Sequence, residues 1–209
     1  VAMGRQRVAG LQGWNSLSIL SPSGVETAVY DKHHLVPFGE YIPFGDLLFD
    51  WFDISAFAAQ TGNAYSAGQG PQVLDLGHMG KMLPLICYEA VFPQDLRTDT
   101  RATWILQITN DAWFGKITGP FQHAAQARLR AIEQGLPLVR VANTGVTSIY
   151  DARGRVLAEL DFDIASYLDA ALPAPLAQTP YARWGEWPLL VLLTSLSILV
   201  LLRDKKPKT

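Results

Sequence analysis

The sequence predicts an α/β domain followed by one C-terminal transmembrane helix. Three observations predict this class. Short apolar runs typical of strands recur along the body of the chain, one longer segment has helical spacing, and an uncharged apolar stretch lies near the end. The chain has 209 residues, of which 49% are hydrophobic and 17% charged. A charged share below the roughly 25% of soluble domains agrees with a membrane segment.

Length and charge narrow the functional classes. A chain of 209 residues suits one domain with a real core. The formal net charge is -2, and no basic stripe or nucleic-acid motif occurs, so we expect no nucleic-acid partner. No positive segment followed by an apolar run opens the chain, so we expect no signal peptide. Because it begins at Val1, we expect a fragment of a longer protein, with Met3 as an alternative late start.

The first half of the body is rich in strand signals. Residues 12–21 and 25–30 are strand-like and flank a Ser-Gly turn, which predicts a hairpin. Residues 44–70 are predicted to form an extended loop with a short helix, and loops of this length are often functional. Further strands are expected over residues 72–76, 81–87 and 103–109.

The second half contains the clearest helix. Residues 88–96 are predicted to be helical, and 110–119 to form a polar turn. A helix is expected over residues 120–134, because Pro120 suits a first turn and Gly135 ends it. Its core face is predicted from Phe121, Ala124, Ala125, Leu129 and Ile132. Strands are expected over residues 138–143, 146–150 and 156–160, the last two as a hairpin.

The C-terminal segment predicts a membrane helix over residues 184–202. The stretch from Trp187 to Leu202 has no charged residue, and its length is close to the roughly 20 residues that a spanning helix needs. The tail over residues 203–209 is basic, which predicts a cytoplasmic C-terminus and an extracytoplasmic domain over residues 1–180. The alternative is a buried C-terminal core helix.

Cys87, the single cysteine of the chain, lies between a predicted apolar strand and a predicted helix. Such a position exposes a thiol, and the helix N-terminus lowers its pKa, which suits a nucleophile. The backbone N–H of Tyr88 or a neighbour could then face an oxyanion. The alternative is a small buried side chain of the core.

A second polar group lies in the segment Asp-Lys-His-His that precedes a Pro-Phe-Gly turn. Lys32 is a candidate for stabilising an oxyanion, with Glu40 positioning it, although a solvated surface lysine is the alternative. We expect no metal site at His33 and His34, because adjacent residues of an extended chain point to opposite faces. The other two histidines of the chain, His78 and His123, have no paired ligand spacing.

Five separated motifs carry a family resemblance. They are YDKHHLVPFGEYIP, LICYE, NDAWFG, GPFQHAAQARLRAIE and TPYARWGEWP, in this order from residue 30 to residue 188. With them the chain resembles the nitrilase, or carbon–nitrogen hydrolase, superfamily, and within it the apolipoprotein N-acyltransferase family. The resemblance implies a nitrilase-like α-β-β-α sandwich, incomplete at its N-terminus, and no cofactor.

The resemblance also assigns roles to residues. Cys87 matches the nucleophile, Lys32 the lysine that stabilises the tetrahedral intermediate, and Glu40 a supporting glutamate. Tyr88 and Glu89 match residues that the acyltransferases need around the nucleophile, and Trp113 lies in a loop that resembles one near the site. The family's general-base glutamate lies well upstream of the lysine, where this sequence offers only Glu26 in an unsuitable context. We therefore expect the base to precede Val1.

The implied reaction moves a fatty acyl group from a membrane phospholipid, through a Cys87 thioester, to a diacylglyceryl-modified apolipoprotein. The acceptor is the α-amino group of its N-terminal cysteine. The implied location is the bacterial inner membrane, with the catalytic domain on the periplasmic face. Apolar residues of the long loop are expected either to form a lid dipping into lipid or to pack conventionally: Leu47, Leu48, Phe49, Trp51, Phe52 and Phe57.

Two alternatives remain at this point. A nitrilase-type amidase that hydrolyses a small amide would share Cys87, Lys32 and Glu40, but the apolar C-terminal segment argues against it. A membrane-tethered binding module that has lost catalysis would explain why no suitable upstream glutamate is found.

Overall fold

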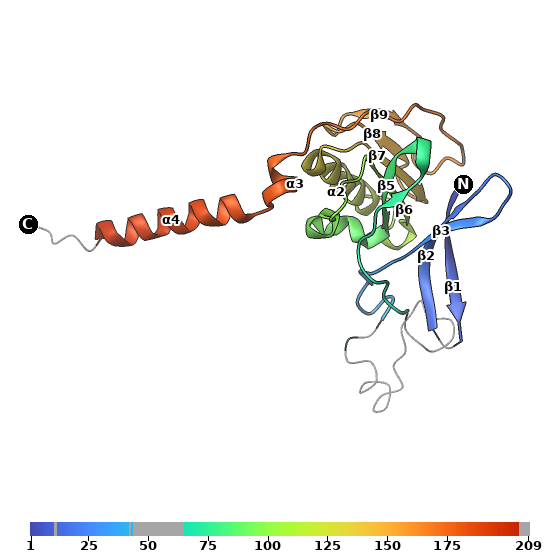
Figure 1. Ribbon diagram of the computed structural model, residues 1–209, viewed down its shortest axis with the longest axis horizontal. Helices are drawn as coiled ribbons and strands as arrows, with labels where there is room; N and C mark the ends of the chain where they lie inside the picture. Colours follow the sequence, from blue (N-terminus) through green and yellow to red (C-terminus); the bar gives the residue numbers. More distant parts are fainter. Residues whose placement is uncertain (11, 42, 44–64, 205–209) are drawn as a thin grey trace, which may run out of the picture.

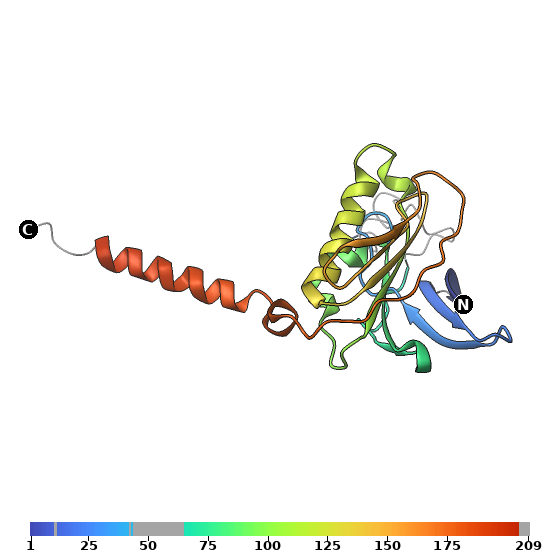
Figure 2. The same ribbon diagram turned by 90° about the horizontal axis from the view of Figure 1, so that it is seen from above.

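The computed structural model describes residues 1–10, 12–41, 43 and 65–204. Its body is layered: helix α2 covers one face of a six-stranded sheet, and a three-stranded sheet packs on the other (Figures 1 and 2). Helix α4 extends away from this body toward the C-terminus (Figure 1). The α/β class is therefore confirmed. The residues proposed as a lid lie outside the described part of the chain.

The three-stranded sheet is antiparallel in the order β1-β2-β3. Its strands are β1 (Ala2–Ala9), β2 (Gln12–Leu20) and β3 (Glu26–Asp31). The predicted hairpin is confirmed as β2–β3, but β1 was missed. This edge strand is exposed at almost every position, so it shows no apolar alternation, and it is held by pairing and by an ion pair between Arg7 and Asp31.

The six-stranded sheet has strands in sequence order, with a parallel centre. Its strands are β4 (Leu74–Asp75), β5 (Lys81–Ile86), β6 (Trp104–Asn110), β7 (Leu138–Asn143), β8 (Ser148–Tyr150) and β9 (Val156–Glu159). The pairs β5–β6 and β6–β7 are parallel, and the other pairs are antiparallel. The carboxyl ends of β5, β6 and β7 therefore meet at one edge, where polar side chains can converge.

Both faces of the central strands are buried, because successive side chains alternate between two cores. Leu83 and Leu85 point to the core beneath α2, where they meet Ile105 and Ala127. The second core lies between the sheets and contains Leu17, Tyr30, Met82, Ile86, Trp104 and Leu106. The continuous apolar sequence of β5 thus reflects a strand covered on both sides.

Helix α2 (Gly119–Gln134) confirms the predicted element but not its predicted face. Ala124 is buried, whereas Phe121, Leu129 and Ile132 are exposed by 41 to 50%. The buried face instead consists of small and polar residues: Pro120, His123, Ala124, Ala127, Arg130, Ala131 and Gln134. The alanines let the helix approach the sheet closely, and the polar residues of this face reach partners in the body. A prediction from apolar periodicity alone therefore assigned the wrong face of α2 to the core.

The predicted helix over residues 88–96 was also wrong. Two short 3₁₀ turns occupy it, η2 (Cys87–Val91) and η3 (Pro93–Leu96), separated by an extended Phe92. The cause is Pro93, because a residue before proline is disfavoured in helical conformation. Two further 3₁₀ turns are η1 (Gly77–Met79) and η4 (Ala112–Phe114).

The chain ends in α3 (Pro180–Trp184) and α4 (Trp187–Asp204). Exposed leucine, isoleucine and valine residues line α4, each with 50 to 63% of its surface accessible to solvent. The alternative of a buried core helix was therefore wrong. Within the described residues, no helix combines the length and apolarity needed to cross a membrane. The transmembrane helix expected over residues 184–202 is therefore not confirmed.

Candidate active site

Cys87 stands at a strained elbow between β5 and η2. Its φ is 51°, in the left-handed region that residues with a Cβ rarely occupy. Strain of this kind persists only where surrounding contacts enforce it, and it concentrates at functional sites. Cys87 is half-buried, and its thiol is not part of a disulfide. The sequence prediction of a nucleophile-like turn is thus matched by the backbone, although the following element is a 3₁₀ turn.

The Glu89 carboxylate is the main anchor of this elbow. It is fully buried, and its Oε2 accepts the backbone N–H of Ile86 at 2.7 Å. Its Oε1 accepts the Tyr30 hydroxyl at 2.7 Å and the backbone N–H of His33 at 2.9 Å. Burial and the Glu89 charge raise the pKa of Tyr30, so this phenol remains a donor. One carboxylate therefore joins the Cys87 turn to the chain beside Lys32.

Lys32 and Glu40 form a buried ion pair, with Nζ 2.6 Å from Oε2. Only 1% of the Lys32 residue is exposed, so the surface-lysine alternative was wrong. Glu40 also accepts the side-chain amide of Asn15 at 3.0 Å and the backbone N–H of Val36 at 2.8 Å. These bonds hold the Glu40 carboxylate in place, and the carboxylate in turn holds the Lys32 ammonium group in position. The structure thus brings together two predicted site residues.

A second buried network holds the backbone carbonyl of Cys87. The Gln107 amide donates to this oxygen at 3.1 Å, and His123 Nε2 lies 3.1 Å from the same atom. His123 Nδ1 lies 2.9 Å from Asp111 Oδ1, and Arg140 donates to Asp111 Oδ2. Gln107 and Arg140 come from β6 and β7, beneath α2, which carries His123. The network therefore clamps the strained residue from the helix side.

Within this network the negative charge of Asp111 is paired with the positive charge of Arg140. Burial would raise the pKa of Asp111, but the His123 hydrogen bond and the Arg140 charge outweigh it and lower that pKa. Burial lowers the pKa of Arg140, while Asp111 opposes the shift. We expect an ionised Asp111 paired with a charged Arg140. Sequence reasoning missed this network, although Gln107 and Arg140 stand in otherwise apolar strands, which was a usable signal.

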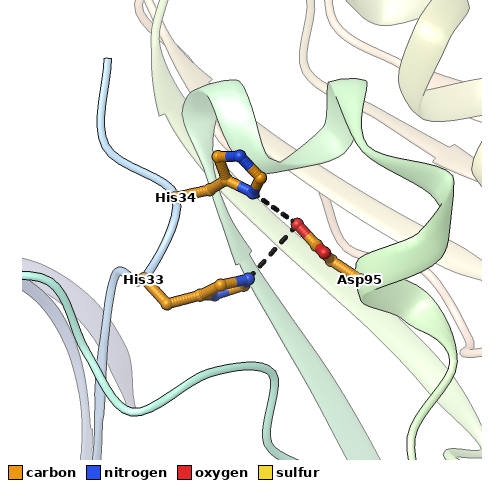
Figure 3. Close-up of side chains that lie close together, drawn as sticks. All are labelled: His33, His34 and Asp95. Atoms are coloured by element: carbon orange, nitrogen blue, oxygen red, sulfur yellow. Dashed lines mark hydrogen bonds and ion pairs between the residues drawn. The ribbon is translucent and has the colours of Figure 1, made fainter. Parts of the chain in front are cut away.

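The remaining residues considered lie in the turns after β5 and β6 and in the segment after β3. Tyr88 packs edge-to-face on Phe92, with ring centroids 4.9 Å apart. Trp113 is 66% exposed in η4, after the strand next to β5. His33 and His34 both turn toward Asp95, contrary to the expected opposite orientations, because the chain bends at His34 instead of staying extended (Figure 3). Burial lowers the pKa of His33, but the hydrogen bond to Glu89 and the charges of Glu89 and Asp95 together outweigh it and raise that pKa.

Comparison with known proteins identifies the family. The model of the carbon–nitrogen hydrolase family matches residues 2–181. The chain belongs to the carbon–nitrogen hydrolase family. This match covers the whole layered body, including both networks around Cys87.

Individual relatives are also similar to this chain. The apolipoprotein N-acyltransferase of Rhodopseudomonas palustris is 46% identical over 197 residues, which are 94% of this chain and 36% of that protein. The apolipoprotein N-acyltransferase of Bradyrhizobium diazoefficiens is 43% identical over 198 residues, again 94% of this chain and 36% of that protein. This chain therefore spans about a third of the length of these curated relatives.

Among solved structures, an amidase from a Nesterenkonia species has a similar fold. Its mutant with an acetamide moiety covalently added at the active-site cysteine aligns with a TM-score of 0.57 and 21% identity. The alignment covers 77% of this chain and 56% of that one. At this identity the likeness supports the nitrilase-like fold alone. In the described residues, α2 is the helical layer on the six-stranded sheet, and the helical layer expected outside the three-stranded sheet is not among them.

Proposed function

We propose that this chain is part of an N-acyltransferase that moves a fatty acyl group from a phospholipid to a lipoprotein through a Cys87 thioester. The observation that carries the proposal is the 46% identity, over 94% of the chain, with a protein named apolipoprotein N-acyltransferase. The strained Cys87 and the buried Lys32–Glu40 pair supply chemistry that suits this reaction.

In the first half-reaction, the Cys87 thiolate attacks the ester carbonyl carbon of the phospholipid. A glutamate of the full-length protein, outside this sequence, removes the thiol proton. Lys32 and a backbone N–H beside Tyr88 stabilise the oxyanion of the tetrahedral intermediate. The C–O bond then breaks, the lysophospholipid leaves with the proton, and a thioester remains on Cys87.

In the second half-reaction, the α-amino group of the diacylglyceryl-modified N-terminal cysteine attacks the thioester carbonyl. The C–S bond breaks, an amide forms, and the amine proton returns through the base to the Cys87 sulfur. A thioester suits this step because amines attack it readily, provided that water is kept away. The reaction therefore has a covalent intermediate between two acyl acceptors.

The proposal gives supporting roles to four residues. Glu40 orients the Lys32 ammonium group through the bond at 2.6 Å. Glu89 holds the elbow through Ile86 N–H and is a positioning residue. Tyr88 and the exposed Trp113 lie at the carboxyl edge of β5 and β6, where they are suited to contact an acyl chain.

We also propose that α4 attaches the protein to the bacterial inner membrane, with the catalytic domain on the periplasmic face. The exposed leucine, isoleucine and valine side chains along α4 support membrane contact, since an apolar patch this large is costly in water. Extraction tests the attachment: detergent should be needed to release the protein, whereas release by salt alone would contradict it.

Acylation of a defined acceptor tests the function. Full-length protein is incubated with vesicles containing a labelled phospholipid and a diacylglyceryl-modified lipopeptide. The wild type and the exposed-carboxylate control Glu159→Gln should form the N-acylated lipopeptide, and Cys87→Ala and Lys32→Ala should not. Retained acylation in Cys87→Ala contradicts the proposal. Hydrolysis of small amides without any N-acylation would favour the amidase alternative instead.

A further inference from the structure

We propose that His33, His34 and Asp95 form a binding site for a divalent transition-metal ion such as Zn²⁺, distinct from the proposed acyl-transfer centre. The two histidines follow β3, and Asp95 lies in η3 (Figure 3). His34 Nδ1 is 2.6 Å and His33 Nε2 is 3.2 Å from Asp95 Oδ2. The three ligand atoms all lie within 4.8 Å of one another.

The contacts of His33 Nδ1 turn the other ring nitrogen toward Asp95. Its Nδ1 lies 2.8 Å from both Tyr30 Oη and Glu89 Oε1. The Tyr30 hydroxyl already donates its proton to Glu89. Because Glu89 only accepts, Nδ1 carries a hydrogen, and Nε2 is the ring nitrogen that faces Asp95 Oδ2, at 3.2 Å.

The buried environment of His33 Nε2 is the second observation. This atom is buried and makes no hydrogen bond to any residue in the described part of the chain. Its contact with Asp95 Oδ2 at 3.2 Å lacks hydrogen-bond geometry, and a buried polar atom without a well-aligned partner is costly. A metal ion bound between the two atoms would satisfy both Nε2 and Asp95.

The surroundings match those of a metal-binding histidine. Such histidines commonly donate their other ring nitrogen to a carboxylate, which fixes the tautomer, and His33 does so to Glu89. Two imidazoles and one carboxylate suit Zn²⁺, Co²⁺ or Ni²⁺ better than Mg²⁺. At bond lengths of about 2.0–2.1 Å, tetrahedral ligands lie about 3.3 Å apart, close to the His33–Asp95 spacing. The His34–Asp95 contact must widen by less than about 1 Å, with loss of its shared proton.

The position of the site gives the ion a structural effect. His33 directly follows Lys32, and Asp95 lies one short turn beyond the turn that begins at Cys87. An ion there would tie the lysine segment to the nucleophile segment. The side chain of His34 is 36% exposed, which leaves a route for the ion and for a water ligand.

Calorimetric Zn²⁺ titration of the purified protein tests the site. The wild type should bind one equivalent, and so should two controls: His78→Ala, which removes an exposed histidine elsewhere, and Cys87→Ala, which removes the thiol as a competing ligand. Asp95→Asn, His34→Ala and His33→Ala should each weaken binding at least about tenfold, which corresponds to 1.4 kcal/mol. Circular dichroism of each variant verifies folding.

Binding of Co²⁺ distinguishes the donor atoms. The wild-type complex should show visible d–d bands without the thiolate charge-transfer band that a cysteine ligand produces. Unchanged Zn²⁺ affinity in folded Asp95→Asn, loss of affinity in Cys87→Ala, or equal competition by Mg²⁺ would each overturn the proposal. In that case the cluster is a protonated His33 held between two carboxylates.

Discussion

The hydroxyl of Tyr30 donates a hydrogen bond to the carboxylate of Glu89 at 2.7 Å. Tyr30 belongs to β3 of the three-stranded sheet, and Glu89 to the turn that follows β5 of the six-stranded sheet. This contact joins the two layers at the place where Lys32 and Cys87 are carried. The site is therefore built between sheets, and its precision depends on buried polar groups more than on apolar packing.

Glu89→Gln should destabilise the protein by about 1–3 kcal/mol, because an amide leaves a buried backbone donor without an acceptor. It should also slow alkylation of Cys87, since the elbow loses its anchor at Ile86. Denaturant unfolding and iodoacetamide kinetics measure the two effects. Glu159→Gln, at an exposed position, is the matched control. Unchanged stability and alkylation in Glu89→Gln would refute the anchoring role.

Glu40→Ala should cost about 3–5 kcal/mol, because it leaves the Lys32 ammonium buried without a partner. The exposed pair of Lys116 and Asp163 supplies the comparison, and Lys116→Ala should change stability by less than about 1 kcal/mol. The double variant Lys32→Met, Glu40→Leu should recover much of the loss. Equal losses of unfolding free energy for Glu40→Ala and Lys116→Ala in urea would show that burial does not set the cost of breaking these ion pairs.

The lowered pKa of Asp111 predicts a pH dependence of stability. A carboxyl group whose pKa is lower in the folded state stabilises the fold fully above its unfolded pKa of about 3.9. This contribution is lost as pH falls through the lower folded value. The stability difference between wild type and Asp111→Asn should therefore shrink below about pH 4. Unfolding free energies between pH 2 and pH 7 test this, and a constant difference would contradict it.

Because the backbone of Cys87 is left-handed, a glycine variant at this position should be no less stable than an alanine variant. Glycine adopts a φ of 51° without strain, whereas alanine retains a cost of about 1 kcal/mol. Cys87→Gly should therefore be at least as stable as Cys87→Ala. Ala90→Gly, in the same turn, should show the ordinary loss of stability. The Tm of each of the three variants, measured by thermal unfolding, tests this order. A Tm of Cys87→Gly well below that of Cys87→Ala would exclude strain at the elbow.

Much of this architecture follows from local sequence. Apolar β5 and β6, the β2–β3 hairpin and the ends of α2 were predicted because period and turn residues are local signals. β1 was missed because an edge strand held by pairing needs no apolar side chains. The face of α2 was assigned wrongly because His123 and Arg130 are buried by partners that come from distant strands.

The candidate site was predicted only in part. Motifs marked Cys87, Lys32 and Glu40 as candidates, and the structure pairs Lys32 with Glu40. The clamp on the Cys87 carbonyl was not predicted, since Gln107, Asp111, His123 and Arg140 meet only through the parallel register of β6 and β7 and the packing of α2. The orientation of His33 and His34 was mispredicted because a bend replaces the expected extended chain.

An acyl thioester on Cys87 is the intermediate that the proposed transfer requires. Full-length protein is mixed with phospholipid vesicles in the absence of acceptor, digested and examined by mass spectrometry. The account predicts one acyl chain on the peptide containing Cys87, removable by neutral hydroxylamine and transferred when the lipopeptide is added. N-acylated lipopeptide formed while the Cys87 peptide never carries an acyl chain would contradict it.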